Sequence, residues 1–330
     1  MTQPTVHELR AADGLSIAVT TAGAAWMSCQ VPVQGQPREV LLGYARAADY
    51  LTQPGYLGAI VGRYANRIAQ SGFELDGQTH ALLPNEGPHQ LHGGPAGFHR
   101  QVWQVVSEAP DRLVLSHTSP DGDQGFPGEL KVRAAYELLP RLTVRLTLEA
   151  TTSAPTLCNL SSHAYFNLDG DAQDIRAHRL HIPASHYLPV RPDLIPTGEQ
   201  AAVAGTPFDF REPRRIGDAL QALQATDAQP RSHDHCWLAG SAQLVSSDGA
   251  LCLTLDSAQP GLQFYAGEFL PRTPDRQGRP YPAHAGLALE PQALPDSPHH
   301  PEWPQPGAVL RPGQVYRHHL TYRFNAAPSA

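Results

Sequence analysis

The sequence predicts an all-β protein, a large antiparallel β-sandwich with very little helix. Runs in which apolar and polar residues alternate recur along the whole chain, as expected of half-buried strands. The 330 residues include 28 glycines and 32 prolines, which is typical of many turns between short strands. Only one segment, 216–227, has apolar residues at helical spacing, so helix is the minority element.

Two hairpins are predicted in the first half of the chain. Within 73–82, the dipeptide Asp76-Gly77 separates two short runs, and Asp-Gly is a strong signal for a tight hairpin turn. Further along, Pro140-Arg141 separates the alternating runs 130–138 and 142–149. These two runs are therefore expected to pair as long antiparallel strands.

The second half continues the same pattern. Asp248-Gly249 is a turn signal directly before a strand at 251–255, and the chain ends with a strong alternating run at 315–324. The helix expected at 216–227 lies between these β segments and the first half.

The stretch 291–312 holds seven prolines, but a strong strand follows it. We therefore interpret it as a structured irregular loop rather than as a linker between domains. No break in composition separates the two halves of the sequence. We expect residues 1–330 to form a single β-sandwich domain.

Charge and hydropathy exclude several classes of function. The chain has 24 Lys plus Arg against 31 Asp plus Glu, a net charge of −7, and no basic block. Nucleic acid and anionic membrane surfaces are therefore not expected partners, because both require clustered positive charge. The N-terminal segment has no signal-peptide pattern, and no window approaches about 18 apolar residues. We expect a cytoplasmic protein.

The basic residues comprise a single lysine, Lys131, and 23 arginines. Chemistry that requires a Schiff-base lysine or a phosphate-loop lysine would depend on Lys131, which belongs to the polar face of a predicted strand. The cysteines have neither disulfide-framework nor zinc-ligand spacing, which predicts reduced thiols. They are Cys29, Cys158, Cys236 and Cys252.

Seventeen histidines raise the question of a metal site. His233 and His235 would share one face of a strand, whereas the neighbours in His299-His300 and His318-His319 would point to opposite faces. None of these sets has the spacing of a known ligand motif. We therefore expect no bound metal.

Polar and aromatic residues interrupt the strand pattern in six segments. Glu290 in the last of them follows an apolar run and precedes a proline, which predicts a position at a strand end. Burial there would raise the pKa of Glu290 toward the range of a general base, whereas a glutamate at a solvated rim would have no such role. The segments are 62–68 (GRYANRI), 90–94 (QLHGG), 159–168 (NLSSHAYFNL), 233–235 (HDH), 260–267 (PGLQFYAG) and 286–292 (GLALEPQ).

In this order, the six segments resemble the aldose 1-epimerase (galactose mutarotase) family. The text between them is also similar, and the resemblance extends from about residue 13 to Phe324, nearly the whole chain. It implies a sandwich of galactose-mutarotase type with an open sugar cleft and with neither metal nor cofactor. It also implies an enzyme that interconverts the α and β anomers of free hexoses such as galactose or glucose.

The resemblance assigns roles to single residues. Glu290 corresponds to the general base that takes the proton of the C1 hydroxyl, and His163 to the general acid that protonates the ring oxygen. Two such groups on opposite sides of the C1–O5 bond suffice for ring opening and closure. The implied sugar-binding set is Asn66, Arg67, His92, Asp234 and Gln263.

Some positions depart from the family pattern. Ser162 and Ala164 flank His163 where the family usually has Asn and Ser, and Glu268 stands in place of a common Asn. These changes bear on the preferred sugar and on the orientation of His163. The acid and base groups are both retained.

Two other functions stay open at this point. A sugar-binding β-sandwich without turnover would share the fold, and a hexose-6-phosphate 1-epimerase would share the chemistry. The latter would need a cationic phosphate pocket made by arginines such as Arg63 and Arg67. Arg63 is the better candidate for a scaffold contact. The expected partner is a small-molecule aldose, and the expected assembly is a monomer or homodimer.

Overall fold

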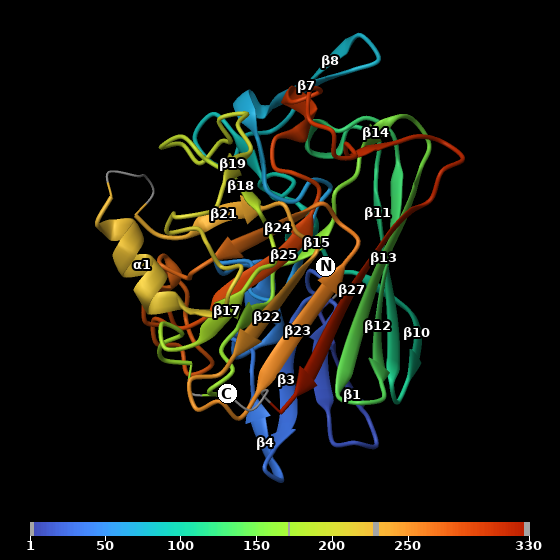
Figure 1. The fold of residues 1–330 in the computed structure, drawn as a ribbon. Helices are drawn as coiled ribbons and strands as arrows, with labels where there is room; N and C mark the ends of the chain where they lie inside the picture. The colour runs from blue at the N-terminus through green and yellow to red at the C-terminus, as the bar shows by residue number, and fades with distance from the viewer. Residues whose placement is uncertain (1–2, 171, 227–230, 327–330) are drawn as a thin grey trace.

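The computed structural model describes residues 3–170, 172–226 and 231–326, and antiparallel sheets dominate the fold (Figure 1). The largest sheet within these ranges has nine strands, and the long strands β12, β13 and β27 lie at its centre. The strand order is β10 (Gln104–Ala109), β11 (Arg112–Ser119), β12 (Leu130–Leu139), β13 (Thr143–Thr152), β27 (Tyr316–Asn325), β23 (Cys252–Ser257), β22 (Ser241–Val245), β17 (Arg179–His181) and β20 (Arg214–Arg215).

A second sheet, with six strands among the described residues, packs against the first. Its central strands come from three of the segments that stood out in the sequence. The order is β16 (Tyr165–Phe166), β25 (Leu287–Gln292), β24 (Gly261–Tyr265), β21 (Asp234–Trp237), β18 (His186–Leu188) and β19 (Ala201–Ala202).

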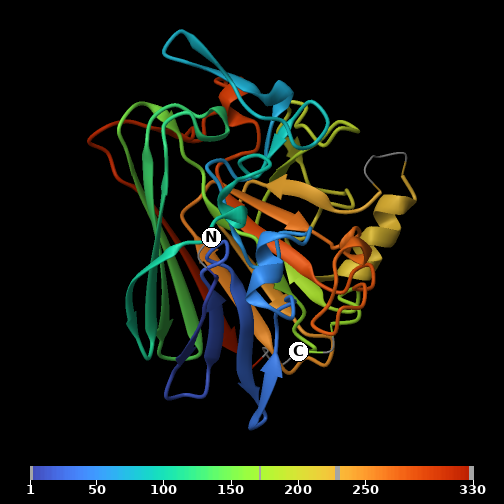
Figure 2. The same ribbon diagram turned by 180° about the vertical axis from the view of Figure 1, so that it is seen from behind.

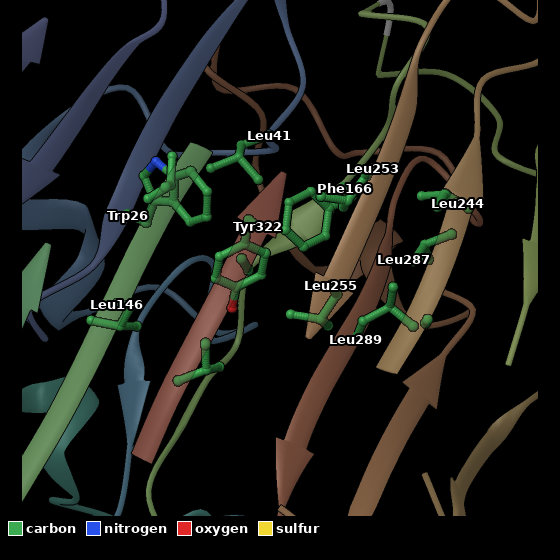
Figure 3. Packing of buried hydrophobic residues seen from close by; sticks show 14 of the residues in the cluster. Trp26, Leu41, Leu146, Phe166, Leu244, Leu253, Leu255, Leu287, Leu289 and Tyr322 are labelled. Atoms are coloured by element: carbon green, nitrogen blue, oxygen red, sulfur yellow. The ribbon is translucent and has the colours of Figure 1, made fainter. Parts of the chain in front are cut away.

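The main hydrophobic core lies between these two sheets (Figure 3). Leu253 and Leu255 of β23 face it from the large sheet, and Leu287 and Leu289 of β25 face it from the second sheet. At one end Tyr322 packs edge-on against Trp26, with 5.1 Å between the ring centroids. The predicted all-β sandwich is therefore confirmed.

A third sheet and several short pairs complete the fold. The third sheet, of strands β1 to β4, lies in front in the view from behind (Figure 2). Its strands are β1 (Val6–Arg10), β2 (Ser16–Thr20), β3 (Trp26–Val33) and β4 (Gln36–Glu39). The two-stranded pairs are β5 (Ile60–Val61) with β15 (Ser161–Ser162), β6 (Arg67–Ile68) with β9 (Gln90–Leu91), β7 (Gly72–Leu75) with β8 (Gln78–Ala81), and β14 (Thr156–Leu157) with β26 (Val309–Leu310). Short 3-10 turns occupy Ala47–Leu51, Ala69–Ser71, Phe98–Arg100, Asp123–Gly125, Leu270–Arg272 and Ser297–His299.

Both predicted hairpins are present. β7 and β8 turn at Asp76-Gly77 and project from one end of the molecule (Figure 1). β12 and β13 pair along their full length, but Leu142 belongs to the turn and not to the strand. Arg141 and Leu142 both have positive φ, and the turn comprises residues 140–142, one residue more than the predicted Pro140-Arg141. The predicted strands at 251–255 and 315–324 correspond to β23 and β27.

The predicted helix corresponds to α1 (Ile216–Gln224), whose apolar side packs on the main core. It ends three residues earlier than expected, because the hydroxyl and the amide of Thr226 both bond to the carbonyl of Leu223 and close the last turn. Asp227 lies outside the described residues. No helix in the described ranges has the length and apolar character needed to span a bilayer.

The proline-rich stretch 291–312 is packed against the fold, as expected of a structured loop. Trp303 is buried beside Leu188 and Leu294, and its indole N–H donates to the carbonyl of Gly198 at 2.9 Å. Val309–Leu310 forms β26 and pairs with β14.

Candidate active site

A cavity of about 570 Å³ brings together all seven of the predicted site residues. They arrive from sequence positions that span more than two hundred residues, so only the tertiary fold makes them neighbours. The seven are Asn66, Arg67, His92, His163, Asp234, Gln263 and Glu290.

The floor of the cavity is the face of the second sheet that points away from the main core. Side chains alternate along a strand, so Leu289 of β25 enters the core while Glu290 enters the cavity. In the same way Phe264 of β24 is in the core and Gln263 is in the cavity. Gln263 lies directly opposite Glu290 in the β24–β25 pairing, and Asp234 follows on β21. Three polar side chains from neighbouring strands thus share this face, with Asp234 two residues along β21 from the position opposite Gln263.

Glu290 lies inside strand β25, so its predicted position at a strand end is wrong. The strand continues through Pro291, which has no N–H to donate. The carbonyl of Pro291 accepts a bond from the Ser161 hydroxyl, so this residue turns its backbone away from β24. On that side β16 pairs only as far as Ala288, and the missing N–H therefore interrupts no ladder.

Two loops place Asn66 and His92 at the wall of the cavity. The backbone N–H of His92 donates to the backbone carbonyl of Asn66. In return, the backbone N–H of Asn66 donates to Nδ1 of the His92 ring at 3.1 Å. Gly93 permits this contact, since a Cβ there would lie 1.9 Å from the carbonyl oxygen of Gly62. Neutral His92 must carry its proton on Nε2, which is then a hydrogen-bond donor.

Glu290 and His163 face each other at the buried end of the cavity. Nε2 of His163 and Oε1 of Glu290 are 3.6 Å apart, and the side chains are 6% and 2% exposed. Burial lowers the pKa of His163 to about 4. Burial, with a smaller contribution from the charge of Asp234, raises the pKa of Glu290 well above its ordinary value. Both shifts favour the uncharged form of each group, so the pair holds one proton over a wide pH range.

Arg67 is held by a carboxylate that the sequence did not single out. Its guanidinium donates to both oxygens of Glu86, with Nε–Oε2 and Nη2–Oε1 distances of 2.6 and 3.0 Å. Burial lowers the pKa of Arg67, but the charges of Asp234 and Glu86 outweigh it and the pKa is raised. Asp234 in turn accepts a 2.6 Å bond from Nε2 of Gln263. The wall is therefore an alternating network of donors and acceptors.

Three cavity residues also form a possible metal cluster. Ligand atoms of His92, His163 and Glu290 all lie within 4.8 Å of one another. However, Nδ1 of His92 already accepts the Asn66 amide, so its other nitrogen is protonated and cannot coordinate a metal in the neutral ring. The trio then offers only two ligands, and the donor set fits proton transfer better than metal binding.

Other highlighted residues are structural. Arg63 is 2% exposed and bonds to Ser119 and to the carbonyls of Pro127 and Gly128, as expected of a scaffold contact. Asn159 bonds to the backbones of Ala65 and Ala293 and so ties the segment before Asn66 to the one after Glu290.

The residues around His163 differ in their surroundings. Phe166 is in the main core, whereas Tyr165 packs in a smaller buried cluster and also lines the cavity. Ala164 is in the core, and Glu268 is absent from the cavity wall among the described residues. Ser162 is fully buried. Their departures from the family pattern thus act from behind or beside the cavity.

Sequence reasoning also missed Tyr56 and Glu86. Both lie in turn-like segments without a strand pattern, 53–58 and 84–89. Their only local signal is a bulky or charged side chain within turn residues, which is common on protein surfaces. Tyr265, Phe269 and Arg272 complete the outer part of the cavity wall.

The chain is similar to known proteins over nearly its full length. A family model described as aldose 1-epimerase matches residues 5–323. Over 327 residues the chain is 42% identical to an aldose 1-epimerase of Escherichia coli, covering 96% of this chain and 94% of that protein. Over 305 residues it is 40% identical to a galactose mutarotase of Homo sapiens, covering 89% and 86%.

Solved structures agree with this result. An aldose epimerase homologue from C. elegans has a TM-score of 0.91 at 29% identity, covering 99% of this chain and 100% of that one. A galactose 1-epimerase from Lactobacillus acidophilus has a TM-score of 0.83 at 26% identity, with the same coverage.

Proposed function

The chain belongs to the aldose 1-epimerase family, and on that premise we propose that Glu290 and His163 interconvert the anomers of free hexoses such as galactose or glucose in this cavity. The observation that carries the proposal is the buried Glu290–His163 pair, whose reactive atoms are 3.6 Å apart beside sugar-binding groups. Polarimetry of freshly dissolved α-galactose tests it, because the enzyme should speed the approach to equilibrium rotation.

The reaction is a double proton transfer. Ionised Glu290 takes the proton of the C1 hydroxyl while Nε2 of protonated His163 donates to the ring oxygen. The C1–O5 bond breaks and C1 becomes an aldehyde. Rotation about C1–C2 exposes the other face, and both transfers then reverse to close the ring. Each positioned transfer contributes about 10²- to 10⁴-fold to the rate.

The proton count of the pair fits this cycle. With the closed ring the proton resides on His163, and with the open aldehyde it resides on Glu290. Burial favours the second arrangement in the free cavity, because both groups are then neutral. After sugar binding, hydroxyls that donate to the Glu290 carboxylate favour its ionised form, with the proton on His163.

The remaining groups hold the ring. Asp234 can accept from sugar hydroxyls, and the protonated nitrogen of His92 can donate to a ring or hydroxyl oxygen. Arg67 and the side-chain amide of Asn66 add donors. The carbonyl oxygen of Gln263, which is buried without a partner among the described residues, adds an acceptor. Hydroxyl groups need both kinds of partner.

We expect activity to depend on pH through the pair. As pH falls below the lowered pKa of His163, about 4, the pair takes a second proton and Glu290 can no longer act as a base. As pH rises through the raised pKa of Glu290, the pair loses its only proton and His163 can no longer act as an acid. Once the uncatalysed rate is subtracted, kcat/KM for galactose should therefore be nearly flat from about pH 5 upward until the pH approaches the raised pKa of Glu290. An acid limb centred near the ordinary histidine value of about 6.5 would contradict this.

Phosphorylated sugars are expected to be poor substrates. The guanidinium of Arg67 is already bonded at two points to Glu86, and Asp234 adds a second carboxylate to the same wall. A dianionic phosphate beside Arg67 would meet the carboxylates of Glu86 and Asp234, and the Arg67 guanidinium is already engaged by Glu86. kcat/KM for glucose 6-phosphate should be at least about 100-fold below that for glucose, which corresponds to about 3 kcal/mol. Coupled assays on both sugars measure it, and equal values would favour the hexose-6-phosphate alternative.

The sugar-binding alternative makes a different prediction from the same structure. A protein without turnover would gain thermal stability from galactose but would not speed mutarotation. We further propose that the chain acts as a single cytoplasmic domain, either monomeric or homodimeric, with a small aldose as its partner.

A further inference from the structure

The orientation of His163 lacks the usual anchor of a catalytic histidine. Catalytic imidazoles are commonly fixed by a hydrogen bond from the second ring nitrogen to a carboxylate or a carbonyl. Here Nδ1 of His163 is buried and has no partner on another residue in the described part of the chain. Another contact must hold the ring plane so that Nε2 stays beside Glu290.

Two tyrosine rings lie close to that imidazole at stacking geometry. Tyr165 stacks on it with ring centroids 4.9 Å apart and planes inclined by 30°, and Tyr56 with centroids 5.6 Å apart and planes inclined by 21°. His92 meets the ring at 5.1 Å with planes at 75°. Within the described residues, the imidazole is thus confined by aromatic contacts rather than by a hydrogen bond to another residue.

Backbone hydrogen bonds hold the segment that contains Tyr56 next to His163. The amide of His163 donates to the carbonyl of Ala59, and the amide of Gly58 donates to the carbonyl of His163, both at 2.9 Å. Tyr56 lies just before this double link and has φ of 55°, a left-handed conformation that is uncommon for an aromatic residue. Such conformations persist where the surrounding structure requires the side chain in one place, and they concentrate at functional sites.

We infer that Tyr56, together with Tyr165, is a positioning residue for the general acid: their stacked rings fix the plane of His163 and stabilise its protonated form. The inference rests on the proposed role of His163. A ring face attracts a cation, so an imidazolium beside two tyrosines is favoured over the same cation beside aliphatic groups. The stack thereby supplies the charged acid that burial alone would disfavour.

The experiment uses Tyr56, which is only half-buried, rather than the fully buried Tyr165. Tyr56→Leu removes the aromatic face and is expected to lower kcat for galactose about 10- to 100-fold with KM changed less than about 2-fold, because geometry and charge of the acid are affected rather than sugar binding. Tyr56→Phe keeps the face and is expected to retain kcat within about 2-fold. If Tyr56→Leu does not fold, Tyr56→Met replaces it as a non-aromatic side chain of similar length.

Tyr187→Leu is the matched control, since Tyr187 is also half-buried and stacks on Phe208 at 4.0 Å but lies outside the cavity wall. It should leave kcat unchanged. Unchanged kcat in Tyr56→Leu would overturn the inference, and so would a loss in Tyr56→Phe as large as in Tyr56→Leu, which would assign the effect to the hydroxyl. A rise in KM alone would make Tyr56 a sugar contact instead.

The variant His163→Asn separates this inference from the proposed function. If His163→Asn is inactive and Tyr56→Leu is active, only the stacking role fails. If His163→Asn retains full activity, the assignment of the acid fails as well.

Discussion

Replacement of Glu290 by glutamine is expected to lower kcat for mutarotation of galactose by about 10³-fold. Glutamine has nearly the same shape, but it cannot take the proton of the C1 hydroxyl. Glu290 is buried on a central strand of the second sheet, directly opposite Gln263. The measurement is the polarimetric rate at saturating galactose, corrected for spontaneous mutarotation.

The same variant should fold at least as well as the parent protein at pH 7. The raised pKa of Glu290 means that folding disfavours the ionised form, which dominates in the unfolded chain at that pH. Replacing it with a neutral amide removes this cost, so Tm should be unchanged or higher. Glu268→Gln is the matched control, because Glu268 is a glutamate near the site but outside the cavity wall, and it should keep full activity. A fully active Glu290→Gln protein would refute Glu290 as the base.

Replacement of His163 by asparagine is expected to lower kcat by about 10²- to 10³-fold. The amide of asparagine can hydrogen-bond the ring oxygen but cannot deliver a proton to it. KM should change little, since the sugar-holding groups Asp234, Arg67 and Asn66 come from other segments of the wall. Steady-state kinetics on galactose and glucose would measure both parameters.

Combining the two substitutions tests whether the pair acts as a unit. Once either proton transfer is lost, the concerted route is closed and the second loss has little left to remove. The double variant Glu290→Gln with His163→Asn should therefore be about as slow as the slower single variant. A further decrease of about 10²-fold would show that the two residues act independently.

Much of the fold could be predicted because strand signals are local. The alternation at 130–138 and the Asp76-Gly77 turn report directly on which residues share a face and where a chain reverses. The predictions were wrong at two element ends, where the local sequence is compatible with either ending or continuing the strand or helix. Pro291 was taken to end its strand, but its backbone faces a side without a pairing partner and the strand continues. The helix end at Gln224 was set by a side-chain bond of Thr226.

The site residues were predicted from their order along the chain and the resemblance that this order carries, not from their positions in space. Nothing local to Arg67 indicates Glu86 as its partner, and nothing local to His163 indicates that Tyr56 stacks on it. Both partners lie in turns without a strand pattern, where a sequence offers no period from which to infer direction.

The sequence by itself determined the strand content and which residues of each strand share a face, because these depend on neighbours along the chain. The tertiary structure decided the 3.6 Å approach of His163 to Glu290, the depth of their burial, and hence the direction of both pKa shifts. The physical reason is that desolvation and stacking depend on what surrounds a group in space, and those surroundings come from segments distant in the chain.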